Sequence, residues 1–177
     1  MDKCAISILV ENNSGVLSRI SGLFSRRGYN IHSLSVGVTE DSKFSRLTII
    51  TFGDAQIIEQ ICSQVKKLAE AVNVEPLPFD QSVFRELILV KVRAEPGRRQ
   101  EIAGLTEIFR ANIIDISEIS ITVELTGNPN KIKAFLSLME PFGIIETART
   151  GLTGILRGSS SIKDDVKNKR SGGNLNG

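Results

Sequence analysis

The sequence predicts an α+β fold of two tandem βαββαβ sandwiches with antiparallel sheets. Three observations lead to this prediction. Apolar residues alternate with polar ones in some segments and recur every three or four residues in others, which are the periods of strands and helices. The order strand, helix, strand, strand, helix, strand is complete within residues 4–79, and it begins again after a polar break. A period of about 80 residues is too long for a solenoid, so two domains of one topology are the simplest interpretation.

The first half supplies each element of the first sandwich. The alternation in residues 4–10 predicts a strand with one strongly apolar face. Apolar residues at helical spacing over residues 16–24 predict a helix. Arg26 and Arg27 suit the negative end of its dipole, and Gly28 is the residue at which the helix stops. The remaining elements are strands at residues 31–38 and 46–52 around a turn at 40–43, a helix over 57–68 and a closing strand at 72–79.

The second half repeats this order after a junction near residues 80–83. An alternating strand at residues 87–93 ends at Glu95-Pro96-Gly97. We then expect a helix over 102–109, strands at 113–117 and 120–125, a helix over 128–142 and a strand at 144–147. The predicted domains are a first ferredoxin-like domain at residues 1–80, a second at 84–157 and a polar, disordered tail at 158–177.

Composition argues against several classes of function. The 18 basic and 18 acidic side chains of residues 1–157 cancel, so the chain lacks the basic surface of a nucleic-acid-binding protein. No apolar run approaches the roughly 20 residues that span a bilayer, and we expect no signal peptide and no secretion. Cys4 and Cys62 do not have the spacing of metal ligands and are expected to be small buried residues in a reducing compartment.

The sequence offers no catalytic centre. His32 is the only histidine, and no Ser or Cys nucleophile has an evident route to it. The acidic pairs Glu40-Asp41 and Asp164-Asp165 fall in a turn and in the tail, where solvation explains them. Gly-rich phosphate loops, zinc-binding motifs and C-x-x-C are absent from the sequence. We therefore expect a binding protein with no catalytic residue and no metal site.

The loop before the first helix predicts a site for the carboxylate of a free amino acid. Its polar residues and Gly lead into a helix whose unpaired N–H groups and positive dipole end face outward. Asn30 follows the end of the helix and adds a carboxamide. The alternative is structural, with Asn13 or Ser14 capping a helix that merely covers the sheet. The candidate pocket comprises Asn12, Asn13, Ser14, Gly15, Val16, Leu17, Asn30 and Ile31.

Five stretches carry a family resemblance: ENNSGVLSR at residues 11–19, GLFSRRGYNI at 22–31, SRLTI at 45–49, EIFRA at 107–111 and ARTG at 148–151. Through them, residues 3–157 resemble the small regulatory subunits of acetolactate synthase (acetohydroxyacid synthase), a family with an ACT domain. The resemblance implies an N-terminal, amino-acid-sensing ACT domain and a homodimer paired through the sheets of these domains. Valine is the implied effector, held by Asn12 and the backbone of residues 15–17 of one copy and by Asn30 and Ile31 of the other.

The resemblance also implies what the chain does. It would be a non-catalytic regulatory subunit that activates a large catalytic subunit and confers valine feedback inhibition on branched-chain amino-acid biosynthesis. Under this implication the chain holds no cofactor, and thiamine diphosphate, Mg and FAD belong to the catalytic partner. The expected compartment is the bacterial cytoplasm, or the plastid stroma for an organelle-encoded chain. Ser14 and His32 depart from the family pattern, in which Pro and Glu are frequent at these positions.

Other proteins share the predicted topology, so the fold alone does not decide the function. An RNA-recognition motif needs exposed aromatic residues on its central strands, and the third strand offers only Phe52. An acylphosphatase needs an Arg in its first loop, which here reads Glu-Asn-Asn-Ser at residues 11–14. The remaining alternative is a freestanding ACT-type amino-acid sensor that controls another partner.

Overall fold

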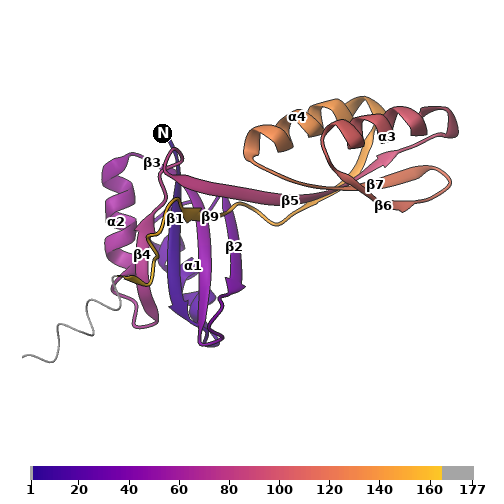
Figure 1. The fold of residues 1–177 in the computed structure, drawn as a ribbon. Helices are drawn as coiled ribbons and strands as arrows, with labels where there is room; N and C mark the ends of the chain where they lie inside the picture. The colour runs from indigo at the N-terminus through magenta and orange to yellow at the C-terminus, as the bar shows by residue number, and fades with distance from the viewer. Residues whose placement is uncertain (1, 165–177) are drawn as a thin grey trace, which may run out of the picture. The chain divides into compact units, whose positions relative to one another are not determined.

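The computed structural model describes residues 2–164, which form two compact units. The first unit combines the chain up to Phe84 with the segment that begins at Leu152, and the second comprises Arg85–Gly151. Each unit contains helices and an antiparallel sheet (Figure 1). The predicted α+β class with two sandwiches of one topology is confirmed.

The first unit has the predicted βαββαβ order. Its sheet has the strand order β2-β3-β1-β4, and each neighbouring pair is antiparallel. Ile31 precedes β2, whereas the sequence predicted it as part of the strand. The elements are β1 (Asp2–Glu11), α1 (Val16–Arg26), β2 (Ser33–Val38), β3 (Phe44–Gly53), α2 (Ala55–Val65) and β4 (Ala71–Pro76).

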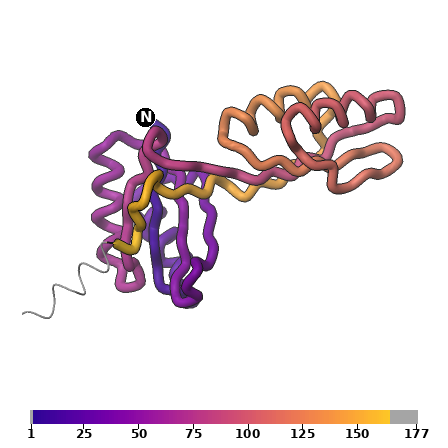
Figure 2. The backbone as a smooth tube through the Cα atoms, in the orientation of Figure 1, coloured from indigo at the N-terminus to yellow at the C-terminus, as the bar shows by residue number. Residues whose placement is uncertain are grey.

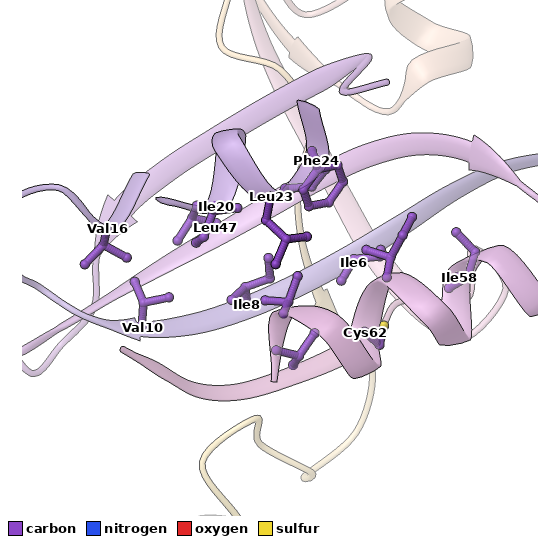
Figure 3. Packing of buried hydrophobic residues seen from close by; sticks show 14 residues of the cluster. Ile6, Ile8, Val10, Val16, Ile20, Leu23, Phe24, Leu47, Ile58 and Cys62 are labelled. Carbon is purple, nitrogen blue, oxygen red and sulfur yellow. The ribbon is translucent and has the colours of Figure 1, made fainter. Parts of the chain in front are cut away.

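The core of the first unit lies between this sheet and its two helices. Ile6, Ile8 and Val10 of β1 point towards the helices, as the alternation predicts. Figure 3 shows them against the apolar faces of α1 and α2. Burying each Ile or Leu side chain contributes about 1.5–3 kcal/mol, so this layer holds both helices on the sheet. The helix residues of this core are Val16, Ile20, Leu23, Phe24, Ile58, Ile61, Cys62 and Val65.

The other face of the first sheet is covered by the C-terminal part of the chain, which the sequence analysis did not foresee. β9 (Thr153–Leu156) pairs with β5 (Ser82–Arg93), and the backbone tube runs back beside the first sheet after Leu152 (Figure 2). As a result β1 is buried on both faces from Ala5 to Val10. The apolar residues of this second layer are Ala5, Ile50, Leu77, Phe84 and Leu152.

Hydrogen bonds hold the C-terminal segment on the sheet. The amide of Gly154 donates to Thr48 Oγ1 at 3.3 Å, and Asn73 Nδ2 donates to the carbonyl of Ile162 at 2.8 Å. Ile162 is only 1% exposed. The sequence predicted disorder from Gly158 onward, but residues 158–164 are described, and Ile162 among them makes the second of these contacts. The rest of the predicted tail, residues 165–177, lies outside the described residues.

The boundaries between the units differ from the predicted domain boundaries. The sequence placed a junction near residues 80–83 and a second domain at 84–157. In the structure β5 already begins at Ser82, and the second compact unit ends at Gly151. The difference arises because β9 joins the first unit through contacts with residues far away in the sequence, which a local pattern does not report.

The second unit repeats the topology of the first. Its sheet order β6-β7-β5-β8 matches β2-β3-β1-β4 strand for strand, and helices α3 and α4 pack on it around Phe135. Two short 3-10 helices, at Pro96–Arg98 and Glu140–Phe142, adjoin these helices. The elements after β5 are α3 (Arg99–Ile108), β6 (Asn112–Ile116), β7 (Ser120–Gly127), α4 (Pro129–Met139) and β8 (Ile144–Arg149).

Gly154→Ala is expected to destabilise the first unit. A Cβ at this position would lie 2.5 Å from the ring of Phe84 and 3.2 Å from Leu77 Cδ1, and overpacking of this kind costs about 1–3 kcal/mol. The loss of stability is measured by urea unfolding and by hydrogen exchange of the amides in β1 and β3. Gly104→Ala is the control, because a Cβ there meets nothing within 4 Å. Equal protection of β1 in both variants would contradict the prediction.

Candidate functional site

The start of α1 is not capped by a side chain. Gly15 occupies the N-cap position with φ of +83°, a left-handed conformation that glycine adopts without strain. Neither Asn13 nor Ser14 accepts a hydrogen bond from the first turn. The amide of Asn13 donates to the carbonyl of Glu11 at 2.9 Å, and the amide of Arg19 donates to the carbonyl of Gly15 at 3.0 Å. Asn13 and Ser14 therefore do not cap this helix, and the amides of residues 16–18 have no side-chain acceptor.

The electrostatics of this helix start favour a carboxylate. The first turn itself contains no acidic residue, which leaves the positive end of the helix dipole without a negative charge from within the helix. Arg19 is already in an ion pair with Glu70, so the backbone amides are the candidate anion-binding groups. The side chain of Val16 is buried in the core, so it offers only its backbone to a ligand, whereas Leu17 is 44% exposed.

Asn12 is tied to the turn between β2 and β3. Its backbone amide donates to the carbonyl of Lys43 at 2.7 Å, and its side-chain Nδ2 donates to the carbonyl of Ser42 at 3.0 Å. The hydroxyl of Ser45 donates to Asn12 Oδ1 at 3.0 Å. Sequence reasoning missed these three partners, because they lie about 30 residues further along the chain and no local pattern connects them with the loop.

The other predicted polar residues have different surroundings. Asn13 Nδ2 donates to Glu11 Oε2 at 2.9 Å, so its carboxamide is turned towards the end of β1. Asn30 is exposed; its carbonyl accepts a hydrogen bond from Thr51 Oγ1 at 2.8 Å, but its carboxamide has no partner within residues 2–164. Ile31 is half-buried and packs against the core. The carboxamide of Asn30 is therefore available to a ligand or to another chain.

The structure brings residues 12–17 together, but Asn30 and Ile31 lie beyond the other end of α1. The helix has 11 residues, and at 1.5 Å per residue it separates these two groups by about 16 Å. A single amino acid is too short to bridge this distance. Within one chain, the predicted pocket is therefore divided into two half-sites at opposite ends of one helix.

A separate cavity of about 550 Å³ lies at the opposite end of β1 from Asn12, lined by the start of β1, by α2 and by the residues after β4. Cys4 and Cys62 both line it. Burial is the main cause that raises the pKa of each thiol, and the Asp2 carboxylate adds to the rise at Cys4. Both cysteines are free. Protonated, partly buried thiols of this kind are poor nucleophiles and metal ligands.

Two further searches concern residues 2–164. In this part of the chain, no group of three or more His, Cys, Asp and Glu side chains is arranged to hold a metal ion. The helices of the same residues are all too short or too polar to cross a membrane.

Two family models match the chain, one in each half. Residues 6–73 match the model described as an AHAS small subunit-like ACT domain. Residues 85–158 match the model of the small subunit of acetolactate synthase. The first match contains the loop at residues 12–17 together with Asn30 and Ile31.

Individual relatives agree with these matches. The chain is 48% identical over 157 residues to the probable acetolactate synthase small subunit of Archaeoglobus fulgidus, which covers 89% of this chain and 98% of the relative. It is 47% identical over 162 residues to that of Methanothermobacter thermautotrophicus, covering 91% and 96%. The crystal structure of the small subunit from Thermotoga maritima matches with a TM-score of 0.84 at 41% identity, covering 90% of this chain and all of that one. The chain therefore belongs to the acetolactate synthase small-subunit family, whose members are the regulatory, non-catalytic subunits of that enzyme.

Proposed function

We propose that this chain binds the large catalytic subunit of acetolactate synthase, raises its activity and makes it sensitive to inhibition by valine. Membership of the small-subunit family supports the catalytic partner. The observation that carries the valine part is the start of α1 behind Gly15, where no side chain caps the backbone amides and the first turn holds no acidic residue. The cofactors thiamine diphosphate, Mg and FAD are assigned to the partner, and this chain supplies only binding and regulation.

The candidate half-sites match the chemistry of a small apolar amino acid. The amides of residues 16–18 would bind its carboxylate, and the oxygen of an Asn carboxamide would accept from its ammonium group. The exposed part of Leu17 and the half-buried Ile31 offer apolar contacts to an isopropyl side chain. Because one methylene in such a pocket changes binding by only about 1–3 kcal/mol, leucine and isoleucine are expected to compete weakly with valine.

A second copy of the chain would complete the pocket. β2 is an edge strand of the first sheet, with Val36 and Val38 exposed. Two copies that pair along β2 about a two-fold axis would run their α1 helices in opposite directions. The loop at residues 12–15 of one copy would then approach Asn30 of the other. This arrangement accounts for a site whose two halves lie about 16 Å apart within one chain.

Inhibition requires that valine binds two states of the complex with different affinity, typically by 1–3 kcal/mol. We propose that valine binds more tightly to the less active state. The residues of this chain hold the effector at the seam between two copies, and the reaction takes place in the catalytic subunit.

The first experiment measures acetolactate formation by the cognate catalytic subunit with and without this chain, across a valine titration. Activation by the chain, reversed as valine increases, is the expected result. Unchanged activity in both conditions, although the two subunits associate, would contradict the proposal.

The alternative function is a freestanding amino-acid sensor that controls a different partner. It uses the same half-sites, so calorimetry with valine tests it in parallel. Valine binding combined with no association between the chain and the catalytic subunit would favour this alternative.

A further inference from the structure

We propose that Ser45 positions the carboxamide of Asn12 for the effector, so that valine affinity depends on a residue outside the pocket. This inference rests on the proposed valine site. Ser45 lies on β3, separated from Asn12 by more than thirty residues in the sequence. Its role is to orient Asn12, and it does not itself contact the ligand.

The sheet register places Ser45 beside the effector loop. Ser45 pairs with Val10, the penultimate residue of β1, and both side chains lie on the face that carries the helices. Ser45 is only 7% exposed. From this position its hydroxyl reaches Asn12 Oδ1 at 3.0 Å. A buried hydroxyl with a defined partner in a loop is a rigid support for that loop, because β3 is paired with strands on both sides.

The hydrogen bonds determine which way the Asn12 carboxamide faces. The carbonyl of Ser42 only accepts, so the group that faces it at 3.0 Å is the NH₂ group of Asn12. The amide oxygen therefore faces Ser45, whose hydroxyl must donate. Ser42 and Ser45 together hold the plane of the amide. One N–H and one lone pair of Asn12 are left for a ligand, and their directions are set by these two contacts.

The loss of the Ser45 hydroxyl would free this carboxamide. Asn12 is exposed, so water can replace the lost donor and the loop is expected to stay folded. The amide would then be held only through Ser42 and could rotate away from the direction that the ligand requires. A bound ligand would have to restore that orientation, which weakens its binding.

The test compares Ser45→Ala with Ser45→Thr, which keeps the hydroxyl on a strand that tolerates threonine. Both variants are assembled with the catalytic subunit, and the valine concentration for half-maximal inhibition is measured together with valine affinity by calorimetry. Ser45→Ala is expected to raise the half-inhibitory valine concentration and to lower valine affinity, each about three- to tenfold, which is the effect of losing one hydrogen bond. Ser45→Thr is expected to match the unmodified chain, and activation without valine is expected to stay unchanged in both.

Ser7→Ala is the matched control. Ser7 is a fully buried serine of the same sheet, and its hydroxyl has no hydrogen-bond partner among the described residues. A normal valine response of Ser7→Ala supports a specific role for Ser45. The inference is overturned if Ser45→Ala responds normally to valine, or if Ser45→Thr loses as much valine affinity as Ser45→Ala. It is also overturned if Ser7→Ala loses as much valine affinity as Ser45→Ala. Failure of the unmodified chain to bind valine would instead overturn the proposed function itself.

Discussion

Asn30→Ala is expected to weaken valine inhibition of the assembled enzyme strongly while leaving its activation intact. The Asn30 carboxamide has no partner within residues 2–164, and the carbonyl that Thr51 uses is retained in the variant. The substitution would therefore remove the proposed ligand contact without removing a structural one. A hydrogen bond to a charged group contributes about 1.5–3 kcal/mol, so the half-inhibitory valine concentration is expected to rise by about 10- to 100-fold.

A valine titration of acetolactate formation measures this effect. Asn112→Ala is a suitable control, because Asn112 is an exposed asparagine on β6 in the second unit. Its titration curve is expected to match that of the unmodified chain. If Asn30→Ala lost activation together with inhibition, Asn30 would have a structural role and the assignment would be wrong. Asn12 gives a less direct test, since its side chain also holds the β2–β3 turn.

Arg149→Ala is expected to destabilise the second unit by about 2–3 kcal/mol. Two hydrogen bonds of 2.8 Å join the guanidinium of Arg149 to the Glu86 carboxylate, and this contact raises the pKa of Arg149. Glu86 is only 4% exposed. Removing Arg149 leaves a buried carboxylate without its partner, which costs about 3–5 kcal/mol for a fully buried pair. The expected loss is smaller here, because half of the Arg149 side chain is exposed.

Urea unfolding, with hydrogen exchange at the β5 and β8 amides, measures this loss. Glu86→Gln combined with Arg149→Ala is expected to recover part of the stability, since the uncompensated charge is gone. Lys91→Ala is the matched control in the same pair of strands: its ion pair with Glu146 is largely exposed, so we expect a change below about 1 kcal/mol. A double variant as unstable as Arg149→Ala would contradict the explanation by buried charge.

Much of the fold could be predicted because it follows from local periodicity. Ile6, Ile8 and Val10 alternate along one strand, and their burial against α1 and α2 is the direct consequence of a side-chain period of two. The order β2-β3-β1-β4 recurs as β6-β7-β5-β8, as the repeat of the pattern implied. Element ends moved by a few residues, since the last residues of a strand depend on its neighbours.

The candidate site was predictable only in part. A polar loop with a glycine before an amphipathic helix pointed to the start of α1, and Gly15 does lie at the N-cap there. The sequence left open whether Asn13 or Ser14 closes that helix end. The backbone geometry decided the question, because a left-handed Gly15 leaves both side chains outside the cap.

By itself, the sequence determined the fold class, the two-fold repeat, the position of the candidate effector loop and the family resemblance, because each of these depends on short segments. Only the tertiary structure decided that β9 and Ile162 cover the outer face of the first sheet and that Ser45 donates a hydrogen bond to Asn12. It also decided that Asn30 lies a helix length away from the loop. Each of these depends on residues that are distant in the sequence and meet only when the sheets form.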